Sequence, residues 1–268
     1  LGVRIARVVS EDSTTVSVVI QNLRTGVSFL WATPILRSTL IVNLPILLSF
    51  GLWNVLLLPM AIKELGATEF EYGLQEGLTS VGFVVSSLLM AKYADRLREG
   101  QWMVIGTIGM GIFGVFYGLA DNIWIAIAMV VASGFLNSPL GIARRLILQK
   151  NTPREMRGRV FSAFSVSRDV VFLIGMALAG LADVLDIRAL VITASVILIG
   201  AGVLTQLMPG LGQPAAEWRR AAQLLRAAKL APAAPAGRPA TAEDFGRLAA
   251  LVPELGAISR QRQVDFLV

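Results

Sequence analysis

The chain has 268 residues, of which 55% are hydrophobic and 16% are charged, and it contains neither histidine nor cysteine. A soluble domain has about a quarter charged residues, so this composition indicates a protein that lies in lipid. The missing residue types exclude a Ser-His-Asp triad, a thiol nucleophile, a zinc site with His or Cys ligands, and a disulfide framework. We therefore expect no enzyme activity and no cofactor.

The hydrophobic residues form six long runs. A membrane-spanning helix needs about 20 apolar residues. Six stretches meet this requirement, approximately 38–62, 72–91, 101–120, 122–143, 160–182 and 189–208. The 24 Lys and Arg residues exceed the 18 Asp and Glu residues, but they lie between these runs, so they indicate a lipid bilayer rather than nucleic acid as the partner. The sequence thus predicts an all-α membrane protein with six transmembrane helices.

The basic residues of the short connections predict the orientation. The segments after the second and fourth spans hold nine of them, namely Lys92, Arg96, Arg98, Arg144, Arg145, Lys150, Arg154, Arg157 and Arg159. The opposite connections hold only Lys63 and Arg188. Short loops rich in Lys and Arg stay in the cytoplasm. We therefore expect both ends of the chain on the cytoplasmic side of a bacterial inner (plasma) membrane.

A motif between the second and third spans resembles a known family. Residues 91–100 are AKYADRLREG, in which Asp95-Arg96 match the GxLxDRxGRR signature of the major facilitator superfamily. Ala91 and Arg98 stand where the signature has glycine, and its final basic pair is replaced by Glu-Gly. In that family the second copy of the signature lies on the cytoplasmic side, between helices eight and nine of twelve.

The connection between the fourth and fifth spans carries a more specific resemblance. The run 149–162, which includes Arg157-Gly158-Arg159, is similar to the loop between helices ten and eleven of the drug and siderophore exporters of that superfamily. Residues 152–155, Thr-Pro-Arg-Glu, also have the pattern of a capping box, which predicts the start of a short cytoplasmic helix.

The resemblance covers about residues 20–210 and implies that the spans are helices seven to twelve, one half of a twelve-helix major facilitator bundle. A further N-terminal six-helix half would be the partner. The predicted divisions are a cytoplasmic central loop (1–37), the six-helix half (38–208), an amphipathic segment with a Pro/Ala linker (209–240), and the start of a cytoplasmic C-terminal module (241–268). The last stretch resembles the first helices of a cyclic-nucleotide-binding module, which would make a cyclic nucleotide a partner. A plain cytoplasmic extension is the alternative.

The resemblance also implies a cytoplasmic gate. Asp95 would contact the partner half, and Arg144 or Arg145, at the end of the fourth span, would pair with it. The alternative is that these arginines only set the topology and bind lipid phosphates. The expected gate and motif residues are Asp95, Arg96, Arg144, Arg145, Arg157, Gly158 and Arg159.

Polar side chains inside the spans are candidates for the substrate or proton pathway, because a charge within the membrane needs a partner or a watery cavity. They are Asn43, Asn54, Glu76, Asn137, Arg168 and Asp169. Adjacent helix positions point about 100° apart. We therefore expect Arg168 and Asp169 to face different partners, either for substrate or proton handling or in an inter-helix ion pair. Glu76 either couples protons or stays solvated at the outer interface, and the asparagines bind either substrate or neighbouring helices.

Two further patterns concern packing and depth. Trp53, Trp102 and Trp124 are expected to be interface anchors near the span ends. Glycines predict close contacts between helices, foremost the GxxxG pairs Gly73/Gly77 and Gly114/Gly118.

Together these features predict a secondary transporter that exports drug-like or siderophore-like small molecules by alternating access, driven by the proton gradient. Because the chain lacks histidine, proton coupling within these spans would use Glu76 or Asp169. The alternatives are an importer on the same fold, or a non-transporting membrane anchor for a ligand-sensing tail.

Overall fold

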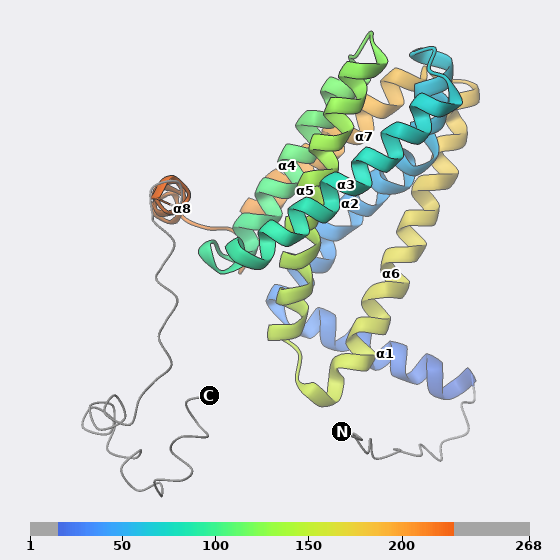
Figure 1. Ribbon diagram of the computed structural model, residues 1–268. Coiled ribbons are helices and arrows are strands. Elements are labelled where there is room, and N and C mark those ends of the chain that lie inside the picture. Colours follow the sequence, from blue (N-terminus) through green and yellow to red (C-terminus); the bar gives the residue numbers. More distant parts are fainter. Residues whose placement is uncertain (1–15, 228–268) are drawn as a thin grey trace, which may run out of the picture. The chain divides into compact units, whose positions relative to one another are not determined.

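The computed structural model describes residues 16–227, and every regular element in this range is a helix (Figure 1). In chain order these are α1 (Val16–Ala32), α2 (Pro34–Pro59), η1 (Met60–Glu64), α3 (Glu69–Tyr93), η2 (Ala94–Arg96), α4 (Glu99–Gly118), α5 (Ile123–Lys150), η3 (Arg154–Met156), α6 (Arg157–Leu178), η4 (Ala179–Asp183), α7 (Ile187–Leu207) and α8 (Ala215–Ala227). The element η1 is a π-helical continuation of α2, and the other η elements are short 3-10 helices.

Six helices, α2 to α7, are long and apolar enough to cross a membrane, which confirms the six predicted spans. The observed helices extend beyond the predicted apolar stretches. For example, α5 continues past Arg144 and Arg145 to Lys150, because Ile147 and Leu148 in this last part are still buried in the core. We call the end of the bundle that holds Arg98, Lys150 and Arg157 the basic end.

Neighbours in space differ from neighbours in sequence. Packing connects α3 to α5, α5 to α4, α4 to α7, α7 to α2, and α2 to α6. The helices α3 and α6 thus stand at the two ends of this series. Only 17% of the most apolar window of each is buried, against 39% to 56% for the other four spans. Both α3 and α6 therefore present broad apolar faces that the described residues leave uncovered.

Glycines allow the closest helix crossings. Gly51 of α2 lies against Gly175 of α6, and a Cβ atom at Gly51 would meet backbone atoms of Phe172, Met176 and Gly175. Of the predicted GxxxG pairs, Gly114/Gly118 packs against α7, whereas no atom of the described residues lies within 4 Å of a Cβ at Gly73 or Gly77. Gly73 and Gly77 are therefore not used for packing within the described bundle, whereas Gly82 of the same helix lies close to Val131 of α5.

A side chain at Gly51 is expected to destabilise the α2–α6 crossing, because backbone atoms cannot move aside as side chains do. Gly51→Val should lower the stability of the full-length protein by about 1–3 kcal/mol, as overpacking does elsewhere. The measurement is the midpoint of thermal aggregation in detergent. Gly200→Val is the matched control, since nothing lies within 4 Å of a Cβ at that position of α7. Equal midpoints for the two variants would contradict the close crossing.

The capping box occurs at a different helix from the one predicted. At the start of α3, the Thr68 hydroxyl accepts from the Glu71 backbone N–H (3.3 Å), and the Glu71 carboxylate accepts from the Thr68 N–H (2.8 Å). The capping box predicted at Thr152 is wrong. Pro153 keeps an extended conformation, the short helix begins after it, and the buried Thr152 hydroxyl has no hydrogen-bond partner among the described residues.

Helices also occur on both sides of the spans. The predicted central loop contains α1, a helix that the sequence interpretation missed, and Gly26 brings it against the backbone of Arg159 at the start of α6. The predicted amphipathic segment forms α8, where Trp218 donates a hydrogen bond to Gln206. The predicted Pro/Ala linker at 231–240 and the C-terminal module at 241–268, with its cyclic-nucleotide expectation, lie outside the described residues.

Candidate functional site

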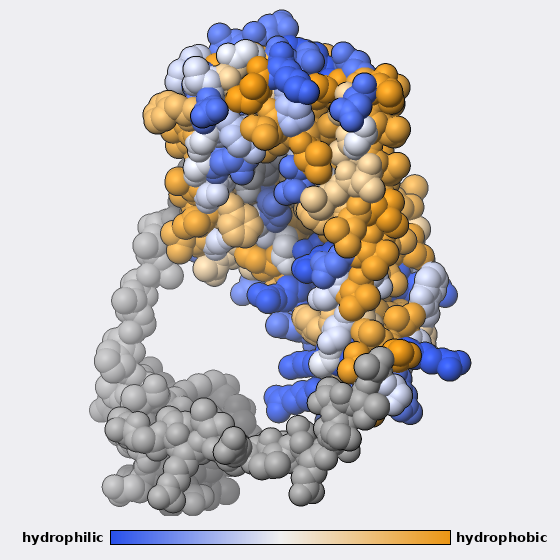
Figure 2. All heavy atoms as spheres, turned by 90° about the vertical axis from the view of Figure 1, so that its right-hand side faces the viewer, coloured by the Kyte–Doolittle hydropathy of each residue, from blue (hydrophilic) through white to orange (hydrophobic). Residues whose placement is uncertain are grey.

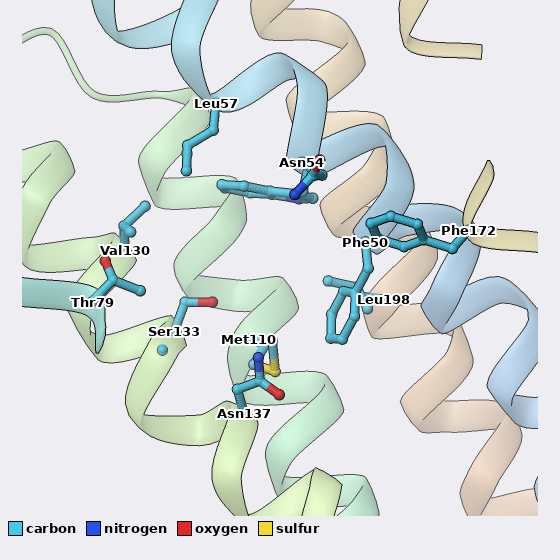
Figure 3. A pocket seen from close by; sticks show the side chains of 12 residues that line it. Phe50, Asn54, Leu57, Thr79, Met110, Val130, Ser133, Asn137, Phe172 and Leu198 are labelled. Carbon is cyan, nitrogen blue, oxygen red and sulfur yellow. The ribbon is translucent and has the colours of Figure 1, made fainter. Parts of the chain in front are cut away.

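A cavity lies in the middle of the bundle, and all six spans contribute to its wall (Figure 3). Its volume is about 270 Å³. The apolar part of the wall consists of Phe50, Leu57, Met110, Val130, Gly134, Phe172 and Leu198, and the polar part of Trp53, Asn54, Thr79, Ser133 and Asn137. None of the described residues that line it is charged. Such a site suits a largely apolar molecule that carries a few hydrogen-bonding groups.

Three polar side chains of the cavity wall are available for a ligand. Figure 3 shows Asn54 of α2 and Asn137 of α5 at opposite ends of the cavity, with Ser133 one helical turn from Asn137. Within the described part of the chain, the side chains of Asn54, Ser133 and Asn137 form no hydrogen bond. Two of the three predicted asparagines, Asn54 and Asn137, thus line the same cavity. Ser133 also lines it and was not predicted as a site residue.

The predicted position of Trp53 is wrong, because its ring forms part of the cavity wall rather than an interface anchor. The ring packs on Tyr117 of α4 with centroids 5.2 Å apart, and its Nε1 atom is buried without a hydrogen-bond partner among residues 16–227. Trp53 is in the interior of α2, and the sequence gives no sign of which helix face turns inward. By contrast, Trp124 is 57% exposed at the start of α5, as an interface anchor would be.

Glu76 does not reach the cavity. It is exposed on α3, whereas its neighbour Gln75 is completely buried, with neither amide atom bonded to a described residue. The structure thus places Glu76 on the surface of the described bundle, and both of its predicted roles stay predictions.

Among the described residues, Asp95 does not form the predicted pair with Arg144 or Arg145. Arg144 instead donates to the Oδ1 atom of buried Asn43 on α2, at 2.8 Å. Asp95 lies in η2 and has no ion pair within the described residues, and the same holds for Arg145. The difference arises because the Arg144 side chain points toward α2, while Asp95 follows the end of α3. The third asparagine, Asn43, therefore accepts a hydrogen bond from Arg144 and is not among the residues that line the cavity.

The prediction that Arg168 and Asp169 face different partners is also wrong. The Arg168 guanidinium curls back along α6 to bind the adjacent carboxylate, with both Nε and Nη2 at 2.8 Å from Oδ1. The flexible arginine stem bridges the angle between adjacent helix positions. The side chains are 44% and 59% exposed, respectively.

Comparison with known proteins adds to this geometry. The family model of the Major Facilitator Superfamily matches residues 39–262, which is most of the chain. The chain belongs to the Major Facilitator Superfamily. This confirms the resemblance found in the motifs and the expected fold, an all-α half of a major facilitator bundle.

Curated relatives of this major facilitator chain carry the names of several kinds of transporter. The Multidrug efflux pump Tap of Mycolicibacterium fortuitum is 24% identical over 191 residues (69% of this chain, 46% of that protein). The Enterobactin exporter EntS of Shigella flexneri is 23% identical over 161 residues (60% and 37%). The Phosphoglycerate transporter protein of Salmonella typhimurium is 27% identical over 113 residues (42% and 24%). The chain thus spans less than half of the length of each relative.

Of the remaining motif residues, Arg157 connects helix ends at the basic end. Arg157 donates to the backbone carbonyls of Thr152 (3.3 Å) and Gln149 (3.2 Å), which joins the end of α5 to the start of α6. Lys150 pairs with Glu99 at the start of α4 (2.5 Å). Gly158 and Arg159 are exposed within the described bundle. This loop motif therefore holds the spans together at one end and contributes nothing to the cavity.

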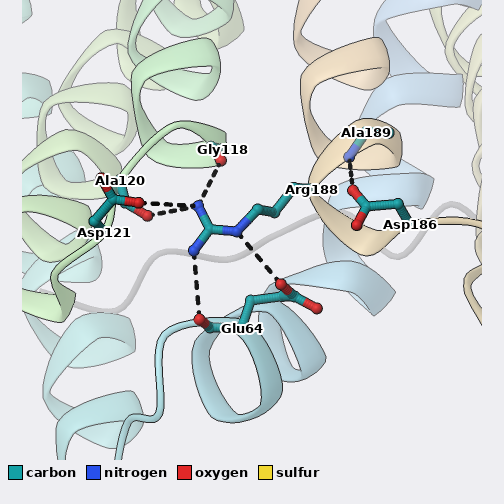
Figure 4. A network of polar contacts seen from close by, with 7 residues as sticks. All are labelled: Glu64, Gly118, Ala120, Asp121, Asp186, Arg188 and Ala189. Atoms are coloured by element: carbon teal, nitrogen blue, oxygen red, sulfur yellow. Dashed lines mark hydrogen bonds and ion pairs between the residues drawn. The ribbon is translucent and has the colours of Figure 1, made fainter.

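At the opposite end, Arg188 connects three helix ends (Figure 4). It pairs with the Glu64 carboxylate at 3.3 Å, and it donates to the backbone carbonyls of Gly118 (3.2 Å), Ala120 (2.7 Å) and Glu64 (3.3 Å). The helices joined are η1, α4 and α7. The sequence interpretation used Arg188 only as a topology marker and missed this network.

Loss of the Arg188 guanidinium is expected to destabilise this end. Arg188→Gln should lower stability by about 2 kcal/mol, because hydrogen bonds to a charged group are lost and the carbonyls of Gly118 and Ala120 lose their donor. Thermal midpoints of the purified full-length protein test this. Asp121→Asn serves as the control, since the Asp121 side chain is 98% exposed and stands 3.9 Å from Arg188. If both variants have the same thermal midpoint as the wild type, the network does not stabilise the fold.

Proposed function

We propose that the full-length protein is a secondary transporter that exports drug-like or siderophore-like molecules by alternating access, driven by the proton gradient. The cavity carries this proposal. Within the described part of the chain, its wall combines aromatic and aliphatic side chains with the unpaired polar groups of Asn54, Ser133 and Asn137, and it contains no charged residue. This chemistry favours amphipathic organic molecules over inorganic ions or sugars. The relatives named as a multidrug efflux pump and an enterobactin exporter support the same substrate class.

The uncovered faces of α3 and α6 support a second half as partner. Large apolar side chains are exposed along both helices, among them Val81, Val84, Val85 and Leu88 of α3 and Val166, Val170, Leu173 and Ile174 of α6. Some of this surface would meet lipid. The open GxxxG pair Gly73/Gly77 favours close contact with another helix. A second six-helix bundle on these two helices would enclose the cavity, and rocking between the halves would open it alternately to either side.

The proposed orientation follows from charge. The basic end would face the cytoplasm of a bacterial cell, because the connections between spans at this end contain most of the Lys and Arg residues of all the short connections. The cavity would then be loaded from the cytoplasm or the inner leaflet, and Asp95 at the basic end would contact the partner half.

Transport by the full-length protein in inverted membrane vesicles tests this proposal. We expect ethidium or a catecholate siderophore to accumulate when a proton gradient is imposed, and a protonophore should abolish the accumulation. Accumulation only in right-side-out vesicles would show an importer. If neither orientation moves a substrate that binds, the protein is a non-transporting anchor.

A further inference from the structure

A second cleft, of about 340 Å³, lies toward the basic end between α3, α5 and α6. Three arginines line it: Arg144 and Arg145 from α5, and Arg168 from α6. Its other walls include Phe83, Phe161 and Phe164. Figure 2, which shows the bundle from the right-hand side of Figure 1, has hydrophilic side chains in a hollow between hydrophobic flanks. The cleft is distinct from the central cavity, since no residue lines both.

The positive charge of this cleft exceeds the negative charge near it. Arg144 has one hydrogen-bond acceptor among the described residues, the neutral amide of Asn43. Within the same residues, no carboxylate lies within 4.0 Å of Arg144 or Arg145. Arg168 is paired with Asp169. Among the described residues, the three guanidinium groups thus have one carboxylate partner, Asp169, which pairs with Arg168 alone.

Arg144 makes this imbalance costly, because it is half-buried and its charge lacks an anionic partner in the described bundle. A charge taken out of water without a counter-charge is strongly unfavourable. Asn43 fixes one side of the guanidinium and leaves its remaining N–H donors available. The arrangement thus holds a preoriented cationic group with unused donors.

The guanidinium groups and hydroxyls that line the cleft suit an oxyanion. Guanidinium groups bind phosphate through pairs of parallel hydrogen bonds. Three serines also line the cleft: Ser87, Ser138 and Ser165. The hydroxyls of Ser87 and Ser138 lie 3.0 Å apart and join α3 to α5 at its wall. We propose that this cleft binds a phosphate group, through Arg144, Arg145 and Arg168. The phosphate belongs either to an anionic lipid headgroup or to a soluble molecule.

The Asp169 carboxylate allows phosphate binding to be distinguished from a purely structural role of the arginines. It competes with a bound phosphate for the Arg168 guanidinium, so its removal should tighten binding, whereas removal of an arginine should weaken it. A purely structural role of these residues would not give opposite signs. The proposal does not depend on transport or on the substrate of the central cavity, so failure of one leaves the other intact.

The test is the thermal midpoint of the full-length protein in neutral detergent, titrated with inorganic phosphate at constant ionic strength. Arg145→Gln and Arg168→Gln should each raise the half-saturating phosphate concentration about tenfold, as loss of a charge-assisted hydrogen bond implies. Asp169→Asn should lower it. Arg154→Gln, at an exposed arginine outside the cleft, should leave it unchanged.

The second arm uses nanodiscs of phosphatidylcholine with and without phosphatidylglycerol, in phosphate-free buffer. Stabilisation by phosphatidylglycerol that the cleft variants weaken assigns the site to a lipid headgroup, and a response to inorganic phosphate alone assigns it to a soluble ligand. If neither probe stabilises the protein, or if Arg154→Gln loses as much as the cleft variants, the proposal is wrong.

Discussion

Trp53→Ala is expected to reduce transport by the full-length protein about tenfold or more. The ring forms part of the cavity wall and stacks on Tyr117, so its loss removes a large apolar contact from any bound substrate and enlarges the cavity. Loss of one buried aromatic contact corresponds to about 1.5–3 kcal/mol, which is tenfold or more in affinity. The measurement is the initial rate of substrate uptake into inverted vesicles at several substrate concentrations.

Trp53→Phe separates the two features of this side chain. The Nε1 donor is buried and has no partner within residues 16–227, and an unpaired buried donor costs stability. A phenyl ring keeps most of the wall and removes that donor, so this variant should transport at close to the wild-type rate. Trp124→Ala, at an exposed position outside the cavity, is the control. Equal transport rates for Trp53→Ala and Trp124→Ala would show that the cavity is not part of the transport pathway.

The spans could be predicted from sequence because each is a predominantly apolar run of sufficient length with at most two charged residues, a property that does not depend on neighbouring helices. Which face of each helix turns inward depends on tertiary packing. For this reason Trp53 was taken for an interface anchor, and Ser133 was not recognised as a lining residue. Hydrophobic periodicity gives little help, since a membrane helix is apolar on the lipid side as well as on the packed side.

Polar partners were equally hard to predict. The sequence identified Arg144 and Asn43 separately, but 101 positions separate them in the chain, and only the packing of α2 beside α5 brings them together. The pairing of Arg144 with Asp95 came from family resemblance. Helix geometry alone predicts different partners for Arg168 and Asp169, because it ignores the reach of an arginine side chain.

Asp169→Asn is expected to abolish proton-driven accumulation while leaving downhill efflux of substrate intact. Of the two acidic residues inside the predicted spans, Glu76 is exposed on α3 and lines neither cavity nor cleft. Asp169 is paired with Arg168, a lining residue of the cleft. An asparagine cannot bind or release a proton, so a variant that keeps the shape of this side chain without its carboxylate loses coupling if Asp169 carries the proton.

The comparison of driven and downhill transport distinguishes coupling from folding. A misfolded variant loses both, whereas a coupling variant loses only accumulation against the substrate gradient. Asp183→Asn changes an exposed carboxylate in η4, outside the cavity and the cleft, and should retain both activities. If Glu76→Gln loses proton dependence and Asp169→Asn keeps it, the coupling carboxylate lies on α3. The ion pair on α6 would then have no part in energy transfer.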